Sequence, residues 1–259
     1  MLSVYNVSKF GLYALFGLLT VMDNSVNAKT LALTSLEWPP FAGESLPEQG
    51  ASIFIVREAL AVMGHELKVD FYPWNRAMRL AETKSNNYHG YFPEYQYDTP
   101  DYLFSAQIGT SPLGLIERKD NPLIWQQVTD LNRYSLGVVD GYENTKELDL
   151  MIANGSQEAE SVTADIQNLR KVAAKRIDGA VIDLLTFQYL LQNSSGDKLK
   201  NSLSANSKLL ENKGLYVAFN DSPEGLFWRE TLNQGLDNLD IESLFDQYMK
   251  RNFSRLFEP

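Results

Sequence analysis

The chain has 259 residues, of which 44% are hydrophobic and 22% charged, so it can bury one large core or two modest ones. Its net charge of −10 argues against nucleic-acid binding, which needs a basic face, and makes a poor surface for anionic lipids. The lack of cysteine excludes disulfides, thiolate metal sites and a cysteine nucleophile.

The N-terminal segment has the features of an export signal. Lys9 precedes an apolar stretch at residues 10–22, which is too short to span a bilayer comfortably. Val26 and Ala28 then occupy the small-residue positions that a signal peptidase reads. We expect residues 1–28 to be a cleaved signal peptide, with an uncleaved anchor or a buried helix as the alternatives. Without a cysteine to carry a lipid, the expected product is a soluble periplasmic protein that has no lipid anchor.

The first half of the mature chain predicts alternating strands and helices. Period-two alternation and turn residues predict strands at 29–35, 65–72 and 88–92. An apolar stripe at helical spacing predicts a helix at 52–63, and Pro73 stands where a second helix begins. This order favours parallel strand pairing in an α/β layer.

A second series of elements follows without a linker rich in Gly, Ser or Pro. The predicted strands are 113–117, 135–139, 159–162, 177–183 and 214–219, and the predicted helices are 146–153, 165–176, 184–192, 223–239 and 241–253. The missing linker favours two lobes that are joined by strands, with chain crossings near 106–112 and 212–217.

Several segments, in this order and spacing, resemble one known family over nearly all of the mature chain. They are LTSLEWPPF, TPDYLFSAQIGTSPLGLIERKD, LGVVDGYENT, RIDGAVIDLLTFQYLL, GLYVAFNDSPEG and FDQYMKRNF. The family is bacterial solute-binding protein family 3, the extracytoplasmic receptors of polar amino-acid uptake systems. The resemblance implies an α/β periplasmic-binding-protein fold with two lobes, each a mostly parallel sheet flanked by helices. Lobe 1 would comprise residues 29–109 and 215–259, and lobe 2 residues 110–214, with two hinge crossings between them.

The resemblance also implies a function. The lobes would close over a small polar molecule, an amino acid or derivative, and hand it to an inner-membrane ABC permease. We expect no enzymatic activity, no cofactor and no obligate oligomer. One alternative is a sensor that binds ligand without transport. Another is an enzyme similar to cyclohexadienyl dehydratases, for which Glu37, Glu94 and Asp183 are conceivable acids and bases. The two histidines, His65 and His89, have no ligand-like partner in the sequence, so we expect no metal site.

Two tryptophans match aromatic positions of the family's ligand cleft. Trp38 follows the first predicted strand, and Trp74 begins the second helix. The alternative for Trp38 is a Trp-Pro-Pro turn that packs on its own lobe. Ser35 matches a polar ligand contact, although serine at a strand end is commonly a turn residue.

Three further residues match ligand contacts of the family, and a fourth, Arg76, is a candidate because of its charge. Asp183 ends a predicted strand and matches the acid that holds a ligand ammonium group, with an internal ion pair or a helix cap as alternatives. Gly141 and Tyr142 would bring backbone donors and a ring to the cleft. Arg76 is a candidate carboxylate ligand, but it lies about 200° around the helix from Trp74, and a salt bridge is an equal alternative.

Residues 90–105, GYFPEYQYDTPDYLFS, depart from the family pattern. Strand alternation predicts that Phe92, Tyr102 and Phe104 are core residues, while Tyr91 and Tyr95 face the cleft.

Family members that bind ordinary α-amino acids place an arginine in this stretch to grip the α-carboxylate. Alignment puts Asp98 or its neighbours there, with no basic residue between 90 and 105. Aromatic walls together with Asp183 would suit an ammonium group through cation–π contact. We therefore expect a small, polar, amine-bearing ligand, with Arg76 as a possible substitute for the missing arginine.

Overall fold

The structure is a computed structural model that describes residues 1, 28–83, 87–194 and 198–254. The expected signal peptide lies outside the described residues, apart from Met1 and Ala28 at its two ends. No helix within the described ranges combines the length and the apolar character that crossing a membrane requires.

Lobe 1, as the structure forms it, is an α/β layer. Its elements are β1 (Thr30–Ser35), η1 (Pro47–Gln49), α1 (Ala51–Val62), β2 (Glu66–Phe71), α2 (Trp74–Glu82), β3 (Gly90–Glu94), β4 (Tyr102–Phe104), α7 (Pro223–Leu236) and α8 (Ile241–Phe253). β1 pairs in parallel with β2 and β3, which makes the predicted β–α–β–α–β order a parallel sheet.

The core of lobe 1 forms where the apolar faces of its helices meet this sheet. Leu31 and Leu33 of β1 and Ile53 and Ile55 of α1 are fully buried there. α1 also packs closely on α7: a Cβ at Gly235 would lie 2.1 Å from the carbonyl oxygen of Ala59, so this approach requires glycine.

Lobe 2 is a second α/β layer. Its elements are β5 (Gly109–Arg118), η3 (Val128–Arg133), β6 (Leu136–Val139), α3 (Lys146–Ala153), β7 (Ala159–Val162), α4 (Asp165–Ala173), β8 (Gly179–Asp183), α5 (Leu184–Asn193), α6 (Lys198–Ser202) and β9 (Leu203–Ala205). Because successive side chains of a strand point to opposite faces of the sheet, lobe 2 has a hydrophobic core on each face. Leu115 and Val181 belong to one core, and their neighbours Ile116 and Ile182 belong to the other.

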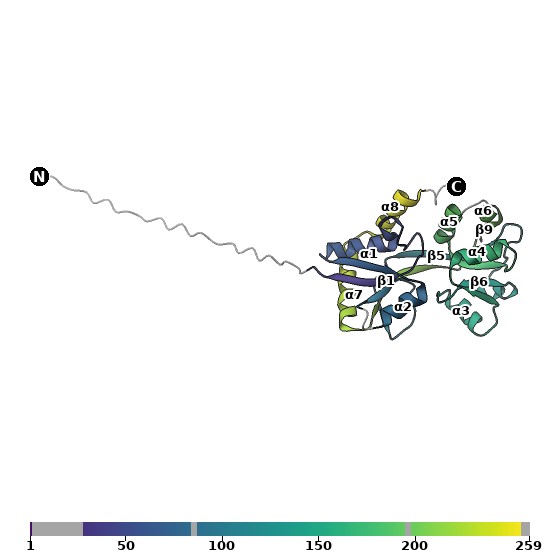
Figure 1. Ribbon diagram of the computed structural model, residues 1–259, viewed down its shortest axis with the longest axis horizontal. Coiled ribbons are helices and arrows are strands. Elements are labelled where there is room, and N and C mark those ends of the chain that lie inside the picture. Colours follow the sequence, from purple (N-terminus) through teal and green to yellow (C-terminus); the bar gives the residue numbers. More distant parts are fainter. Residues whose placement is uncertain (2–27, 84–86, 195–197, 255–259) are drawn as a thin grey trace.

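Two long strands connect the lobes. β10 (Glu211–Asn220) pairs antiparallel with β5 through residue 215, and with β3 and β4 from residue 216 onward. The hydrogen-bonded strands therefore follow the order β2-β1-β3-β10-β5-β8-β6-β7. Figure 1 shows the lobes side by side with β5 running between them, and α8 beside α1 at the lobe 1 end. The predicted lobe boundaries at 109/110 and 214/215 fall on these crossing strands.

The element boundaries agree with prediction to within about three residues except at the start of β5, and α4 and α7 each end three residues before the predicted end. The structure has α3, β7 and α8 at the predicted ranges. β5 begins at Gly109 rather than 113, and β10 at Glu211 rather than 214, because the two crossing strands pair with each other there. Five short elements, η1, η3, β4, β9 and α6, had no counterpart among the predicted strands and helices.

Candidate functional site

Two small adjoining cavities lie between the lobes. The Glu94 cavity is lined by Leu36, Trp38, Trp74, Pro93, Glu94, Tyr95, Tyr142 and Glu143. The Asp165 cavity is lined by Trp38, Tyr95, Leu113, Val139, Tyr142, Glu143, Asn144, Asp165, Val181, Ile182 and Asp183. Both lie just beyond the carboxyl ends of parallel strands, where β1, β3, β6 and β8 finish. This is the position at which open α/β sheets bind ligands.

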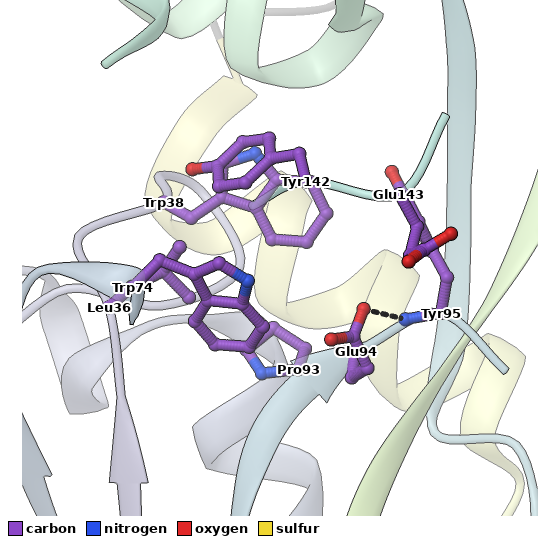
Figure 2. A pocket seen from close by; sticks show the side chains of 8 residues that line it. All are labelled: Leu36, Trp38, Trp74, Pro93, Glu94, Tyr95, Tyr142 and Glu143. Carbon is purple, nitrogen blue, oxygen red and sulfur yellow. Dashed lines mark hydrogen bonds between the residues drawn. The ribbon is translucent and has the colours of Figure 1, made fainter. Parts of the chain in front are cut away.

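Aromatic rings from both lobes form the walls. The Trp38 ring lies 5.9 Å from that of Tyr95 and 6.2 Å from that of Tyr142, measured between ring centroids. A tight turn fixes Trp38, whose N–H donates to the Ala42 carbonyl at 2.8 Å. Trp74 is the first residue of α2, and in Figure 2 its ring lies near those of Trp38 and Tyr142, with the carboxylates of Glu94 and Glu143 to the other side of the view.

Three buried carboxyl groups line the cavities. Glu94 ends β3, Asp165 begins α4 and Asp183 ends β8, and each is less than a tenth exposed. Burial raises the pKa of Glu94 to about 8, even though its Oε1 accepts the Tyr95 N–H at 2.7 Å. Burial and the nearby Asp183 charge raise the pKa of Asp165 to about 7. Perturbed carboxyl groups in a cleft are typical of functional sites.

Asp183 is more fully hydrogen-bonded than the other two. Its Oδ2 accepts the Ser111 hydroxyl at 2.6 Å, and its Oδ1 accepts the Thr186 N–H at 2.7 Å. Burial nevertheless raises its pKa to about 6. The Thr186 contact shows that Asp183 caps α5, as one interpretation of the sequence held, while it also lines the Asp165 cavity.

Lys213 of β10 lies next to the cavities and carries the opposite charge. Its Nζ is 4.3 Å from the centroid of the Tyr95 ring and donates to the Asn144 carbonyl oxygen. The positive charge of Lys213 favours the ionised forms of Glu94 and Glu143. Burial has the larger effect, so the pKa of each of these carboxyl groups is raised above its ordinary value. Glu143 stands at a more exposed position than the other acids.

Direct contacts join the lobes around the cavities. The Tyr95 hydroxyl lies 2.7 Å from Ser111 Oγ; since Ser111 donates to Asp183, Tyr95 donates to Ser111. Trp74 Nε1 donates to the Gly141 carbonyl at 3.1 Å.

A second contact joins α2 to the loop that follows β6. Asn75 Nδ2 donates to Asp140 Oδ2 at 2.6 Å. Gly141 has a φ of +79°, and a Cβ there would lie 2.2 Å from Asn75 Oδ1. A side chain at 141 would therefore be strained and would also clash with lobe 1.

The structure brings five of the nine predicted site residues to the cavity walls: Trp38, Trp74, Tyr95, Tyr142 and Asp183. The other four lie elsewhere. Ser35 is fully buried, and its Oγ donates to the Phe92 carbonyl at 2.7 Å. Gly141 contacts Trp74 through its carbonyl but does not line a cavity. The ligand-binding roles of all nine stay predictions.

Tyr91 and Arg76 differ most from their expected positions. Tyr91 does not face a cavity: its ring packs on Trp74 and Tyr102, and its hydroxyl bonds to that of Tyr97 at 2.7 Å. Arg76 lies on the exposed side of α2, with its Cζ 5.1 Å from the centroid of the Tyr72 ring. The helix that turns Trp74 inward turns Arg76 outward, so its guanidinium lies outside both cavities, and its role as a substitute for the missing arginine stays a prediction.

Sequence reasoning assigned no ligand contact to the cavity residues Glu143, Asn144 and Asp165 or to Lys213 beside them, and it named Glu94 only as a conceivable acid or base of an enzyme. Two of them carried a usable signal, because Glu94 lies two residues beyond the strand predicted at 88–92 and Asp165 begins the helix predicted after the strand at 159–162. Both therefore belong to the strand edge where ligands bind. Lys213 gave no such signal, because its strand was expected to begin one residue later.

The described residues contain no group of three or more His, Asp or Glu that could hold a metal ion. His65 and His89 instead lie against Trp228 of α7, with ring centroids 5.4 and 6.1 Å away.

Solved structures share this fold over most of the chain. The GluR0 ligand-binding core from Nostoc punctiforme, in complex with L-glutamate, is 18% identical with a TM-score of 0.66; the match covers 86% of this chain and 99% of that one. A histidine kinase sensor domain with similarity to periplasmic binding proteins is 15% identical with a TM-score of 0.71, over 86% and 96% of the two chains.

A transport protein also matches. An amino acid ABC transporter substrate-binding protein from Streptococcus pneumoniae, bound to L-arginine, is 15% identical with a TM-score of 0.67, over 89% of this chain and 97% of that one. No family model and no curated protein matches the sequence. The likenesses confirm the fold that the sequence resemblance implied, a two-lobed α/β fold of the periplasmic-binding-protein class.

Proposed function

We propose that this protein is a non-enzymatic, extracytoplasmic binding protein that closes its two lobes on a small, polar, amine-bearing molecule. The observation that carries the proposal is the pair of cavities between the lobes, which are walled by rings and carboxyl groups from both sides. A ligand in this position touches both lobes at once, so its contacts favour the closed arrangement.

The chemistry of the walls supports an amine. Ring faces attract an ammonium group by about 0.5–2 kcal/mol each, more when water is excluded. Glu94 and Asp183 come from different lobes, so a cation between them gains charge-assisted contacts only when the lobes are closed. No arginine lines either cavity, which disfavours a ligand whose main feature is a carboxylate.

Binding is best tested by thermal shift with a panel of amino acids, amines and quaternary ammonium compounds. A ligand raises stability by RT ln(1 + [L]/Kd). We expect amine-bearing compounds to raise the melting temperature and to make the protein more compact in small-angle X-ray scattering. Asp183→Asn should weaken the shift, whereas Glu242→Gln, an exposed acid on α8, serves as the matched control. The proposal is wrong if no compound shifts the melting temperature or changes the compactness.

Delivery to an inner-membrane ABC permease is part of the proposal. The likeness to an ABC transporter substrate-binding protein supports it, but a histidine kinase sensor domain shares the fold equally well. Sensing without transport is therefore the second candidate. Deletion of the gene separates them: loss of labelled-ligand uptake supports transport, whereas unchanged uptake with a lost transcriptional response supports sensing.

The proposal that this protein is not an enzyme can be tested separately. Buried acids with raised pKa values, such as Glu94 and Asp165, are also what a dehydratase-like enzyme would use. We expect prephenate and arogenate to remain unchanged after prolonged incubation with the protein. Turnover that Glu94→Gln abolishes would show an enzyme instead.

A further inference from the structure

The two cavities are adjoining parts of one elongated site. Four residues line both of them: Trp38, Tyr95, Tyr142 and Glu143. The rings of Trp38, Tyr95 and Tyr142 therefore stand at the junction. On one side of it lies Glu94, and on the other lie Asp165 and Asp183. The site thus has a carboxyl group at each end and aromatic rings in the middle.

Both ends lie within electrostatic reach of the same rings. Burial, and after it the nearby carboxyl groups, raises the pKa values of the Tyr95 and Tyr142 hydroxyls. For each tyrosine these carboxyl groups include both Glu94 and Asp165. The Tyr95 and Tyr142 rings line both cavities, so a molecule that lies on them has Glu94 on one side and Asp165 on the other.

The carboxyl groups at the two ends are poorly compensated by the protein. Asp165 is 8% exposed and forms no ion pair with any described residue; the hydrogen bond that lowers its pKa comes from its own backbone. Glu94 is 6% exposed and accepts one backbone N–H through Oε1. A buried carboxylate is unfavourable unless a cation or several donors meet it. Lys213 is the nearby cation, and it acts at the Glu94 end, where it also bonds to Asn144.

The site lacks the opposite feature, a planar cationic receptor for a carboxylate. No arginine lines the cavities, and Arg76 lies on the outer side of α2. A ligand carboxylate within the cavities would meet Glu94 or Asp165, which repel it whenever they are ionised, while Lys213 beside the cavities donates to the Asn144 carbonyl.

Building on the proposed function, we infer that the ligand class is a short, unbranched dication with an amino group at each end and no carboxylate, that is, an aliphatic diamine. One ammonium group sits at Glu94 and the other at Asp165 and Asp183. The methylene chain between them packs on the rings of Trp38, Tyr95 and Tyr142.

The test compares ligands of equal length by titration calorimetry. The probes are 1,4-diaminobutane, butylamine and 4-aminobutanoate, which differ only in the group at one end; L-arginine and L-glutamate are added as α-amino acids. We expect the diamine to bind at least about 10-fold more tightly than butylamine, a factor that corresponds to about 1.4 kcal/mol. We expect 4-aminobutanoate to bind more weakly than butylamine.

The outcomes separate this inference from the proposed function. Tighter binding of L-arginine, L-glutamate or 4-aminobutanoate than of the diamine overturns the diamine inference and leaves a binding protein for amino acids. Equal affinity for butylamine and the diamine also overturns it, because the second acidic end then contributes nothing. If no probe and no compound of the wider panel binds, both proposals fall.

Two variants test the two ends separately. Glu94→Gln and Asp165→Asn keep the shape of each side chain and remove one charge. Each should reduce diamine affinity to about that of butylamine, at least about 10-fold. Butylamine has one charge and should lose affinity in only one of the two variants. Glu242→Gln is again the control. If both variants keep full diamine affinity while their melting curves show a folded protein, the inference is wrong.

Discussion

Replacement of Glu94 by glutamine should stabilise the ligand-free protein at alkaline pH. Burial raises the pKa of Glu94 to about 8 from an ordinary value of 4.5, so the folded state favours the protonated form. The stability that this preference provides is complete below pH 4.5 and is lost as the pH rises toward 8. At about 1.36 kcal/mol per pKa unit, the loss near pH 8 is up to about 4 kcal/mol. Glu94→Gln cannot ionise, and its amide oxygen can still accept the Tyr95 N–H.

The assay is a pair of melting curves for wild type and Glu94→Gln, at pH 5 and pH 8 without ligand. For a chain of this size, about 4 kcal/mol corresponds to a rise of roughly 8–16 °C. We expect the rise at pH 8 and little difference at pH 5, while Glu242→Gln follows wild type at both. A difference that is the same at both pH values would refute the reasoning, because it would show that ionisation of Glu94 does not change the stability of the protein. The same variant should bind diamines poorly. Glu94 would then lower the stability of the protein at alkaline pH while it contributes to ligand binding.

Three further predictions follow from the site and its surroundings. Diamine affinity should rise from pH 6 to pH 8, because Glu94 and Asp165, with pKa values of about 8 and about 7, lose their protons over this range. Calorimetry in buffers of different ionisation enthalpy should detect the protons that are released on binding. An affinity that does not change with pH would contradict this prediction. Asn75→Ala removes the bond to Asp140, so it should weaken binding about 5-fold by disfavouring closure; unchanged affinity and unchanged scattering would show that this contact does not matter. Arg76→Ala should leave affinity within about 2-fold, because its guanidinium lies outside the cavities, and a large loss would restore it to the site.

Local sequence patterns predicted most of the fold because each element carries its own signal. The helix that starts after Ser222 shows this, since Ser222 caps it and Pro223 fits its first turn. The short strands β4 and β9 could not be predicted in the same way. They exist because β10 and β5 offer partners, and their residues make no regular pattern of their own.

Site residues were predictable when they lie at or next to the end of a helix or strand. They were less predictable when the direction or the burial of the side chain determines whether it reaches the cavity. Trp74 begins α2, Asp183 ends β8 and Trp38 follows β1 in the next loop, and all three line the cavities. Ser35 is the exception, because it ends β1 but bonds to the Phe92 carbonyl inside lobe 1. Tyr91 was expected to face the cleft, but it lies within β3, and the rings on both sides of it fill that space. The acid at Asp165 was visible as a helix start, yet only the packing of α4 against the rest of lobe 2 reveals that the carboxyl group faces a cavity.

The glycine at position 141 gives this molecule a place where its affinity can be tuned from outside the cavities. Because a Cβ there would lie 2.2 Å from Asn75 Oδ1, the methyl group of Gly141→Ala would push the Asn75 side chain aside and disturb its bond to Asp140 across the lobes. The substitution changes no residue that lines a cavity, so we expect it to act on the population of the closed state. Larger side chains at this one position should therefore give a series of receptors with successively weaker binding.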